Sequence, residues 1–363
     1  MKSGNNISRR VVLAGGAIGA GALFTVPACE RKESSAIRAK SAEGQPDQPP
    51  FLTPWSPPPG VERDLTPGRT PIRLCSWSQN TTLDYRSDMS VTDIVKRIRD
   101  AGFTAGNATG PYDRRNPWNE ATESEIRELK EALETCDVLF FDMHTYTNNI
   151  HPDLEQRKKN HRYVIEQCEA AERVGCPMVT THVGTLSPIT PIAPHPDNWT
   201  WETWKLQVSV IKQLLADTAG MNVSFGIEAV NMTSMNNPKA HLRLIEDVGD
   251  PRLKVCLDPV NMIHLGVYYR TTELINECFD LLGDNIIAAH AKDTYVLPDR
   301  MSAYITEVAA GEGELDYETY LVRLSRLKNP CPLLIEHLPE EKYPVAKQYI
   351  EDTAAKVGVS FYI

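Results

Sequence analysis

Short hydrophobic runs alternate with longer amphipathic segments along most of the chain, from about residue 70 onward. The runs are four to seven residues long and rich in β-branched and aromatic side chains, which is typical of strands buried in a parallel sheet. They predict eight strands, at residues 72–77, 103–107, 138–144, 178–182, 223–228, 253–258, 286–290 and 333–336.

The segments between the runs have the period of an α-helix. Val91, Ile94, Val95 and Ile98 follow the spacing i, i+3, i+4 and i+7, which places them on one helix face. Similar patterns predict helices near residues 126–133, 154–174, 204–216, 239–248, 272–282, 317–327 and 345–357. Eight strand–helix units predict one (β/α)8 TIM barrel over residues 70–363. A doubly wound sheet is the alternative, but the first run leads into no Gly-rich phosphate loop.

The first residues of the chain have the pattern of an export signal. Arg9 and Arg10 precede an uncharged stretch, 11–27, that is rich in Gly and Ala. This order is typical of a twin-arginine signal peptide. A membrane-anchor helix is the alternative, but about 17 residues are few for crossing a bilayer. Cys29 follows a small residue, as at a lipoprotein cleavage site, so we expect removal of residues 1–28 and a periplasmic protein or one attached to the membrane by lipid at Cys29.

The segment 29–69 contains eight prolines and many polar residues, which predicts a disordered linker between the signal and the barrel. Removal of residues 1–28 takes away three basic residues and no acid, so the net charge changes from −10 to −13. Such a charge disfavours nucleic acid or an anionic membrane surface as a partner. The seven cysteines after Cys29 are odd in number and lack CxxC spacing, so we expect buried free thiols.

Four consecutive strands end in a side chain that can bind a metal: Glu228, Asp258, His290 and Glu336. In a barrel the carboxyl ends of the strands meet at one rim, where function resides. Three carboxylates placed together repel one another unless a proton or a cation lies between them. We therefore expect one divalent metal ion, Mn²⁺ first, with Mg²⁺, Co²⁺ and Zn²⁺ as alternatives. Four unrelated rim residues are the other interpretation.

The region from residue 223 to residue 336 resembles the sugar phosphate isomerase/epimerase superfamily of xylose isomerase-like TIM barrels. The resemblance is carried by Glu228-Ala229-Val230-Asn231, by residues 253–261 (LKVCLDPVN), by His290-Ala291-Lys292-Asp293, by residues 311–316 (GEGELD) and by Leu334-Ile335-Glu336. It implies that the four strand-end residues bind the metal and that Glu228 and Glu336 also move the substrate proton.

The expected activity is a metal-dependent sugar isomerase or epimerase that works through an enediolate. A carboxylate removes the proton α to a carbonyl while the metal stabilises the charge that forms. We expect a small carbohydrate as the substrate and allow for a homo-oligomer. The residues that we expect to contact substrate are Trp77, His144, His182, Asn231, Asn261, Lys292 and Asp293.

Two departures from the ketose epimerases leave other functions open. Ser234 occupies the position, six residues after Glu228, where those enzymes have a second Glu, and Asn261 replaces a His. A lyase that cleaves keto-glycosides by β-elimination is therefore the main alternative. An abasic-site endonuclease needs a basic surface and more metal ligands. A non-catalytic sugar-binding lipoprotein has no need of a charged metal site.

Overall fold

The computed structural model describes residues 60, 62–78, 81–83, 89–109 and 116–363. The predicted signal peptide with its two arginines, Cys29 and most of the predicted linker lie outside these residues. Within the described part, every helix is too short or too polar to cross a membrane.

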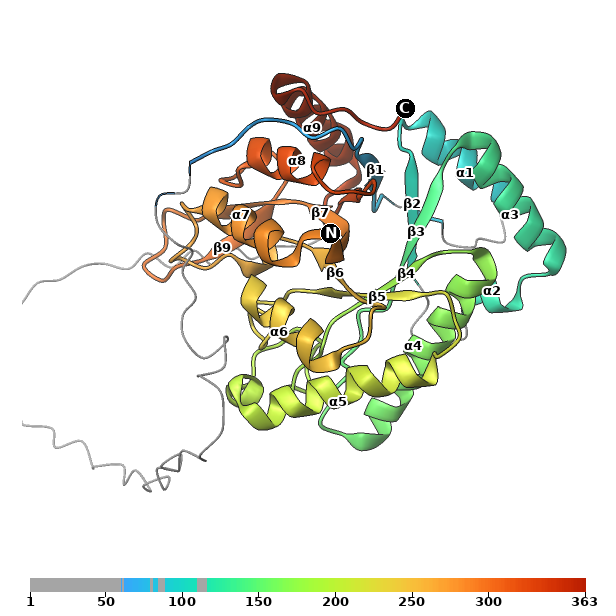
Figure 1. Cartoon of the computed structure of the whole chain (residues 1–363), viewed down its shortest axis with the longest axis horizontal. Coiled ribbons are helices and arrows are strands. Elements are labelled where there is room, and N and C mark those ends of the chain that lie inside the picture. Colours follow the sequence, from blue (N-terminus) through green and yellow to red (C-terminus); the bar gives the residue numbers. More distant parts are fainter. Residues whose placement is uncertain (1–59, 61, 79–80, 84–88, 110–115) are drawn as a thin grey trace, which may run out of the picture. The chain divides into compact units, whose positions relative to one another are not determined.

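Eight parallel strands form a nearly closed barrel (Figure 1). Their bounds are β1 Arg73–Ser76, β2 Ala105–Thr109, β3 Leu139–His144, β4 Met178–Thr181, β5 Ser224–Glu228, β6 Leu253–Leu257, β7 Ile286–Ala291 and β10 Pro332–Ile335. The strands follow one another in chain order, and β10 pairs with β1. Beside the remaining seam, between β1 and β2, the Thr104 amide donates to the Leu74 carbonyl at 3.0 Å. The eight predicted strands and the predicted fold are thus confirmed.

Helices surround the strands (Figure 1). Their bounds are α1 Val91–Asp100, α2 Pro117–Glu120, α3 Glu123–Cys136, α4 Leu154–Val174, α5 Trp201–Asp217, α6 Pro238–Val248, α7 Thr271–Leu282, α8 Tyr317–Ser325 and α9 Tyr343–Val357. Local capping sets several ends. The Ser90 side chain accepts from the Asp93 amide at the start of α1, and Gly175 ends α4 in the left-handed conformation. All eight expected helices are present, whereas the short α2 was not expected.

Two layers of buried side chains follow from the alternation of residues along each strand. One layer packs between strands and helices, and the other forms a small cluster inside the barrel. The inner cluster consists of Cys75, Ala105, Phe141, Met178, Cys256, Ala288 and Leu334. Asp258, His290 and Glu336 each lie two residues beyond a member of that cluster, so alternation turns them to the same interior side.

The described cysteines fit the expectation of free thiols. All seven are unpaired, and every one except Cys136 is buried. Buried thiols act as small hydrophobic side chains. Cys75 and Cys256 belong to the inner cluster of the barrel, where larger residues would compete for the same space.

An antiparallel hairpin interrupts the regular repeat after β7. It consists of β8 Asp293–Val296 and β9 Ile305–Val308. The Asp293 carboxylate fastens the chain at the base of this hairpin, because it accepts from the backbone amides of residues 294, 311, 313 and 315 at 2.8–3.2 Å. Sequence periodicity did not predict this hairpin, since its two strands are short and largely polar.

Candidate metal centre and substrate cavity

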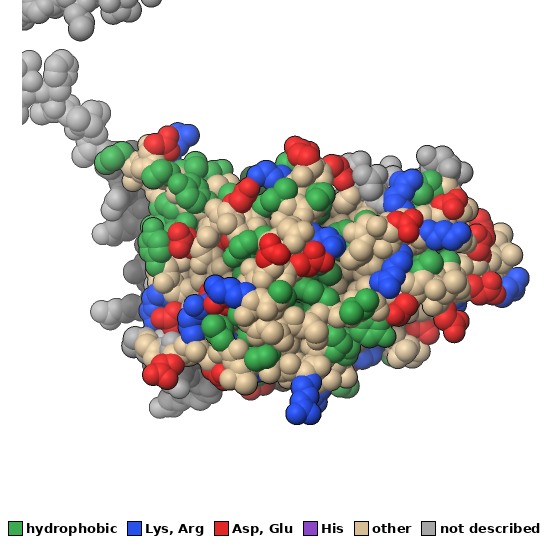
Figure 2. Space-filling model, turned by 90° about the horizontal axis from the view of Figure 1, so that it is seen from above, with side chains coloured by type: hydrophobic (Ala, Val, Ile, Leu, Met, Phe, Trp, Pro, Cys, Tyr) green, Lys and Arg blue, Asp and Glu red, His purple; other side chains and the backbone are tan. Residues whose placement is uncertain are grey.

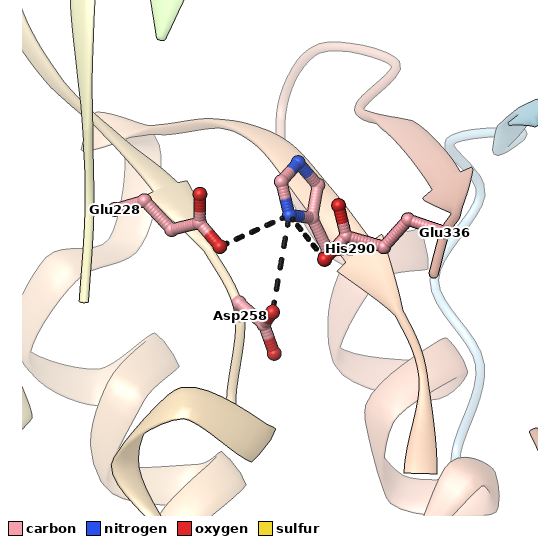
Figure 3. A group of neighbouring side chains, drawn as sticks. All are labelled: Glu228, Asp258, His290 and Glu336. Carbon is pink, nitrogen blue, oxygen red and sulfur yellow. Dashed lines mark ion pairs between the residues drawn. The ribbon is translucent and has the colours of Figure 1, made fainter. Parts of the chain in front are cut away.

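The four strand-end residues converge on one point inside the rim. Glu228 closes β5, Asp258 follows β6, His290 lies on β7 and Glu336 follows β10, and one ligand atom from each lies within 4.8 Å of the others. The His290 Nδ1 atom is 3.3 Å from Glu228 Oε1, 3.9 Å from Asp258 Oδ2 and 3.2 Å from Glu336 Oε1. Figure 3 shows the three carboxylates around that nitrogen. The predicted convergence is therefore present.

This donor set fits a divalent cation. All four side chains are almost completely buried. Glu336 Oε2 nevertheless has no hydrogen-bond partner among the described residues, and His290 Nδ1 and Asp258 Oδ2 have ion-pair neighbours there but no well-oriented hydrogen bond. Buried polar atoms without a partner are costly, and a cation between them would satisfy them together. Three carboxylates and one imidazole are ligands that Mn²⁺, Mg²⁺ and Zn²⁺ accept.

Neighbouring side chains hold the four residues in place. The Asn261 Nδ2 atom donates to Glu228 Oε1 at 2.7 Å. The second nitrogen of His290 lies 3.2 Å from Cys256 Sγ, and the Tyr320 hydroxyl donates to the His290 carbonyl at 3.0 Å. Such contacts outside a metal site orient the ligands and hold each ring in a fixed position.

Lys292 supplies a positive charge inside the site. Its Nζ atom lies 2.9 Å from Asp258 Oδ2, 3.1 Å from Glu336 Oε1 and 3.1 Å from Glu307 Oε1. Burial alone would lower the pKa of Lys292, but these carboxylates raise it well above its usual range. The ammonium ion is therefore charged at neutral pH and offsets part of the negative charge of the site.

The carboxyl groups respond differently to this environment. Burial raises the pKa of Asp258 to about 6; the attraction of Lys292 opposes this rise, and the repulsion of Glu336 and Glu228 adds to it. Burial acts the same way on Glu228, but the charge of His290 lowers its pKa to about 2. The pKa of Glu336 also lies well below its usual range, because His290 and Lys292 outweigh its burial. Both glutamates are thus ionised at neutral pH.

A cavity of about 820 Å³ lies above the four residues, and Glu228, Lys292 and Glu336 belong to its lining. Three other residues predicted to contact substrate also line it: His182, Asn231 and Asn261. A series of aromatic rings forms one wall. Tyr146 stacks on His182 at a centroid distance of 4.7 Å, and both rings belong to the cavity lining.

Trp77 and His144 lie behind this wall. Their rings meet edge to face at 4.7 Å, and neither belongs to the cavity lining. His144 is completely buried, with Nε2 2.8 Å from the Asp142 carboxylate, which accepts from Thr180. Their position indicates support of Tyr146 rather than direct contact with a ligand.

Asp293 is not placed for substrate contact. Its carboxylate is directed to four backbone amides, one in β8 and three in the segment after β9, and Asp293 is absent from the cavity lining. The physical reason is that a buried carboxylate next to a glycine-rich loop finds its acceptor partners in the loop backbone. We therefore do not carry Asp293 into the proposed substrate contacts.

The sequence profile of the family described as xylose isomerase-like TIM barrel matches residues 95–355. The chain belongs to this family. Among curated proteins, none matches the chain.

Solved structures share the fold at low identity. A xylose isomerase domain protein from Planctomyces limnophilus is 20% identical, with a TM-score of 0.57 over 80% of this chain and 99% of that chain. A xylose isomerase-like TIM barrel protein from Mycobacterium smegmatis, in complex with magnesium, is 15% identical, with a TM-score of 0.54 over 79% and 96%. D-psicose 3-epimerase, in the presence of D-fructose, is 11% identical, with a TM-score of 0.53 over 79% and 96%. These likenesses show the shared barrel.

In this xylose isomerase-like barrel, many residues of the cavity lining were not predicted from the sequence, among them Tyr146, Glu307 and His337. Tyr146 lies two residues after His144 and beyond the end of β3, so the search for residues that close a strand did not include it. His337 follows Glu336 and has a left-handed backbone, with φ of 57°, which few side chains adopt without strain. Its Nδ1 atom lies 2.8 Å from Glu307, which comes from the hairpin that the sequence did not reveal.

Proposed function

We propose that this family member is a metal-dependent enzyme that removes the hydrogen α to the carbonyl of a small carbohydrate, as an isomerase or epimerase working through an enediolate. The convergence of three carboxylates and one histidine, with ligand atoms within 4.8 Å of one another, is the observation that carries the proposal. Similarity to a D-psicose 3-epimerase and to a magnesium-bound relative supports it.

The chain's own residues divide the chemistry between them. A divalent cation, for which Mn²⁺ stays our first expectation, would stabilise negative charge on the substrate oxygens when bound. Glu228 and Glu336 are the candidate bases, because they are ionised carboxylates on different sides of the site. Asn261 holds Glu228 through its 2.7 Å hydrogen bond. Lys292 lines the cavity and is placed to donate to a substrate oxygen.

A lyase acting on keto-glycosides by β-elimination is the second candidate. Ser234, at the position of the second Glu of ketose epimerases, is buried and donates to Gln207 at 2.5 Å, outside the cavity lining. Asn261, at the position of the ketose-binding His, is engaged with Glu228. The two groups that hold a ketose in those epimerases thus have no equivalent here, which favours a different substrate.

Metal analysis combined with solvent exchange tests both candidates. Purified protein is expected to contain about one divalent ion per chain, and the Glu336→Gln variant much less. Sugars and keto-glycosides are then incubated with the loaded protein in heavy water. An isomerase or epimerase incorporates deuterium at the reacting carbon, whereas a lyase releases the aglycone and leaves an unsaturated keto-sugar. Turnover of a substrate with neither outcome would refute proton abstraction.

The nucleic-acid and binding-protein alternatives are less well supported. The face drawn in Figure 2 mixes acidic and basic side chains and shows no continuous basic surface. Within the part of the chain that the structure describes, one cluster of metal-competent residues is found, whereas an abasic-site endonuclease needs three ions. A binding protein has no need for two ionised glutamates beside a metal.

We also propose that the protein is exported by the twin-arginine route and acts in the periplasm or at the membrane. The Arg9–Arg10 pair and Cys29 support this proposal. An Arg9→Lys, Arg10→Lys double variant is expected to stay in the cytoplasm, as judged by cell fractionation. Cys29→Ala is expected to be exported without lipid. Export of the double variant at the normal level would contradict this route.

A further inference from the structure

The outer part of the cavity differs from its floor. Four large apolar side chains line it and remain 45–58% exposed: Ile192, Met232, Leu265 and Tyr304, here called the apolar mouth. They come from four separate segments, which follow β4, β5 and β6 and precede β9. Large apolar groups that gather around an opening usually mark a binding surface. Here the opening leads to the candidate metal centre.

The size of the cavity exceeds what one sugar needs. Even if each of the twelve heavy atoms of a hexose took the ~30 Å³ of a water molecule in the liquid, the sugar would fill about 360 Å³. The cavity measures about 820 Å³. A substrate whose sugar ring lay at the candidate metal centre would leave the apolar mouth unfilled unless it carried a further group.

The charges of the lining restrict what that group is. Lys292 is the one Lys or Arg among the described residues that line the cavity, and it already lies within 3.1 Å of three carboxylates. His337 is paired with Glu307 at 2.8 Å. A phosphate or carboxylate at the mouth would thus meet no lysine or arginine of the described lining that carboxylates do not already engage. An uncharged apolar group would instead cover the exposed side chains.

We propose that the apolar mouth binds the apolar aglycone of an uncharged keto-glycoside whose oxidised sugar ring is held at the metal centre. The inference rests on the proposed function for the position of the sugar and its carbonyl, and it names the substrate class as keto-glycosides with an aryl or similar apolar aglycone. The aglycone lies against Ile192, Met232, Leu265 and Tyr304. Free monosaccharides and sugar phosphates are correspondingly weaker ligands.

Binding measurements with a fluorescent aglycone test the inference. The probes are 4-methylumbelliferone, its β-glucoside and β-galactoside, and the free sugars, each titrated into the metal-loaded protein. We expect at least one glycoside to bind tenfold or more tightly than its free sugar, and the free aglycone to bind measurably. An Ile192→Ser, Leu265→Ser double variant should reduce the preference for the glycoside over its free sugar to threefold or less. It should also weaken the binding of the free aglycone.

Ile189→Ser is the matched control. Ile189 follows β4, as Ile192 does, and is 81% exposed, but it does not line the cavity. It should leave all affinities unchanged. The inference is overturned if neither aglycone nor glycosides bind, or if the control has the same effect as the double variant. A dimer that the double variant dissociates would assign the apolar mouth to a second copy of the chain. Metal content and deuterium exchange test the proposed function independently of this inference.

Discussion

The two halves of the barrel rim use the same backbone geometry for different purposes. Strands β5, β6, β7 and β10 lead into charged side chains that meet at one buried point. Strands β1, β3 and β4 lead into the rings of Trp77, His144 and His182, which together with Tyr146 form an aromatic group. Metal binding by closely spaced charges depends on every member of the set, whereas each ring contact contributes a small and separable free energy. We therefore expect all-or-none effects in the first half and graded effects in the second.

The largest effect is expected for Asp258→Asn. The change removes one charge from the donor set, so metal content measured by mass spectrometry should fall from about one ion per chain to near zero. The rate kcat/KM should fall by about 1,000-fold or more, since metal and acid–base catalysis are lost together. Glu307→Gln, a carboxylate outside the donor set, is the control and should retain the metal. Full metal occupancy in Asp258→Asn would exclude the proposed site.

Lys292→Met tests the positive charge within the same half. Loss of the ammonium ion leaves Asp258 and Glu336 uncompensated, and breaking such a buried pair costs about 3–5 kcal/mol of stability. The metal-free variant should therefore melt at a lower temperature, and metal addition should raise Tm more than in the wild type. Activity should fall about 100-fold if Lys292 also contacts substrate. An unchanged Tm without metal would contradict this electrostatic role.

Tyr146→Leu probes the aromatic half. The ring stacks on His182 at 4.7 Å, and contacts of this kind are worth about 0.5–1.5 kcal/mol each. We expect KM to rise by up to about tenfold, with kcat within threefold of wild type and metal content unchanged. Steady-state kinetics and metal analysis on one preparation check these values. Loss of metal in this variant would show that the two halves are not separable.

His241→Gln is expected to have the smallest effect at neutral pH. Burial lowers the pKa of His241 to about 4, against weaker raising effects of the Asn237 and Ile227 carbonyls. The unfolded chain takes up a proton below about pH 6.5 and the folded chain only near pH 4, so folding stability falls as the pH decreases through this window. Between pH 7 and pH 5 this one group accounts for about 2 kcal/mol.

Urea unfolding at the two pH values measures this contribution. The His241→Gln variant should lose about 2 kcal/mol less stability than the wild type on acidification, with equal metal content and activity at pH 7. An equal acid sensitivity in both proteins would place the effect elsewhere, with the charged half of the rim as the next region to test.

Much of the barrel and the donor set could be predicted from the sequence because the signals are local. A buried strand has a period of two, so Cys256 and Asp258 must share one side, as must Ala288 and His290. Once the fold was a parallel barrel, consecutive strand ends had to meet at one rim. This reasoning needs no knowledge of loops, which is why the convergence of the four strand-end residues could be predicted in advance.

The loops were decided by the tertiary structure. Asp293 looked like a substrate contact next to Lys292, but the return of the chain at residues 311–315 brings three amides to its carboxylate. Glu307 reaches the cavity because the hairpin pairs β8 with β9.

The apolar mouth likewise combines residues from segments far apart in the sequence. No single stretch contains that pattern. The sequence by itself therefore determined the strands and their end residues, whose spacing is a property of one short segment. Only the folded chain decided which loop side chains converge, since their neighbours depend on long-range contacts.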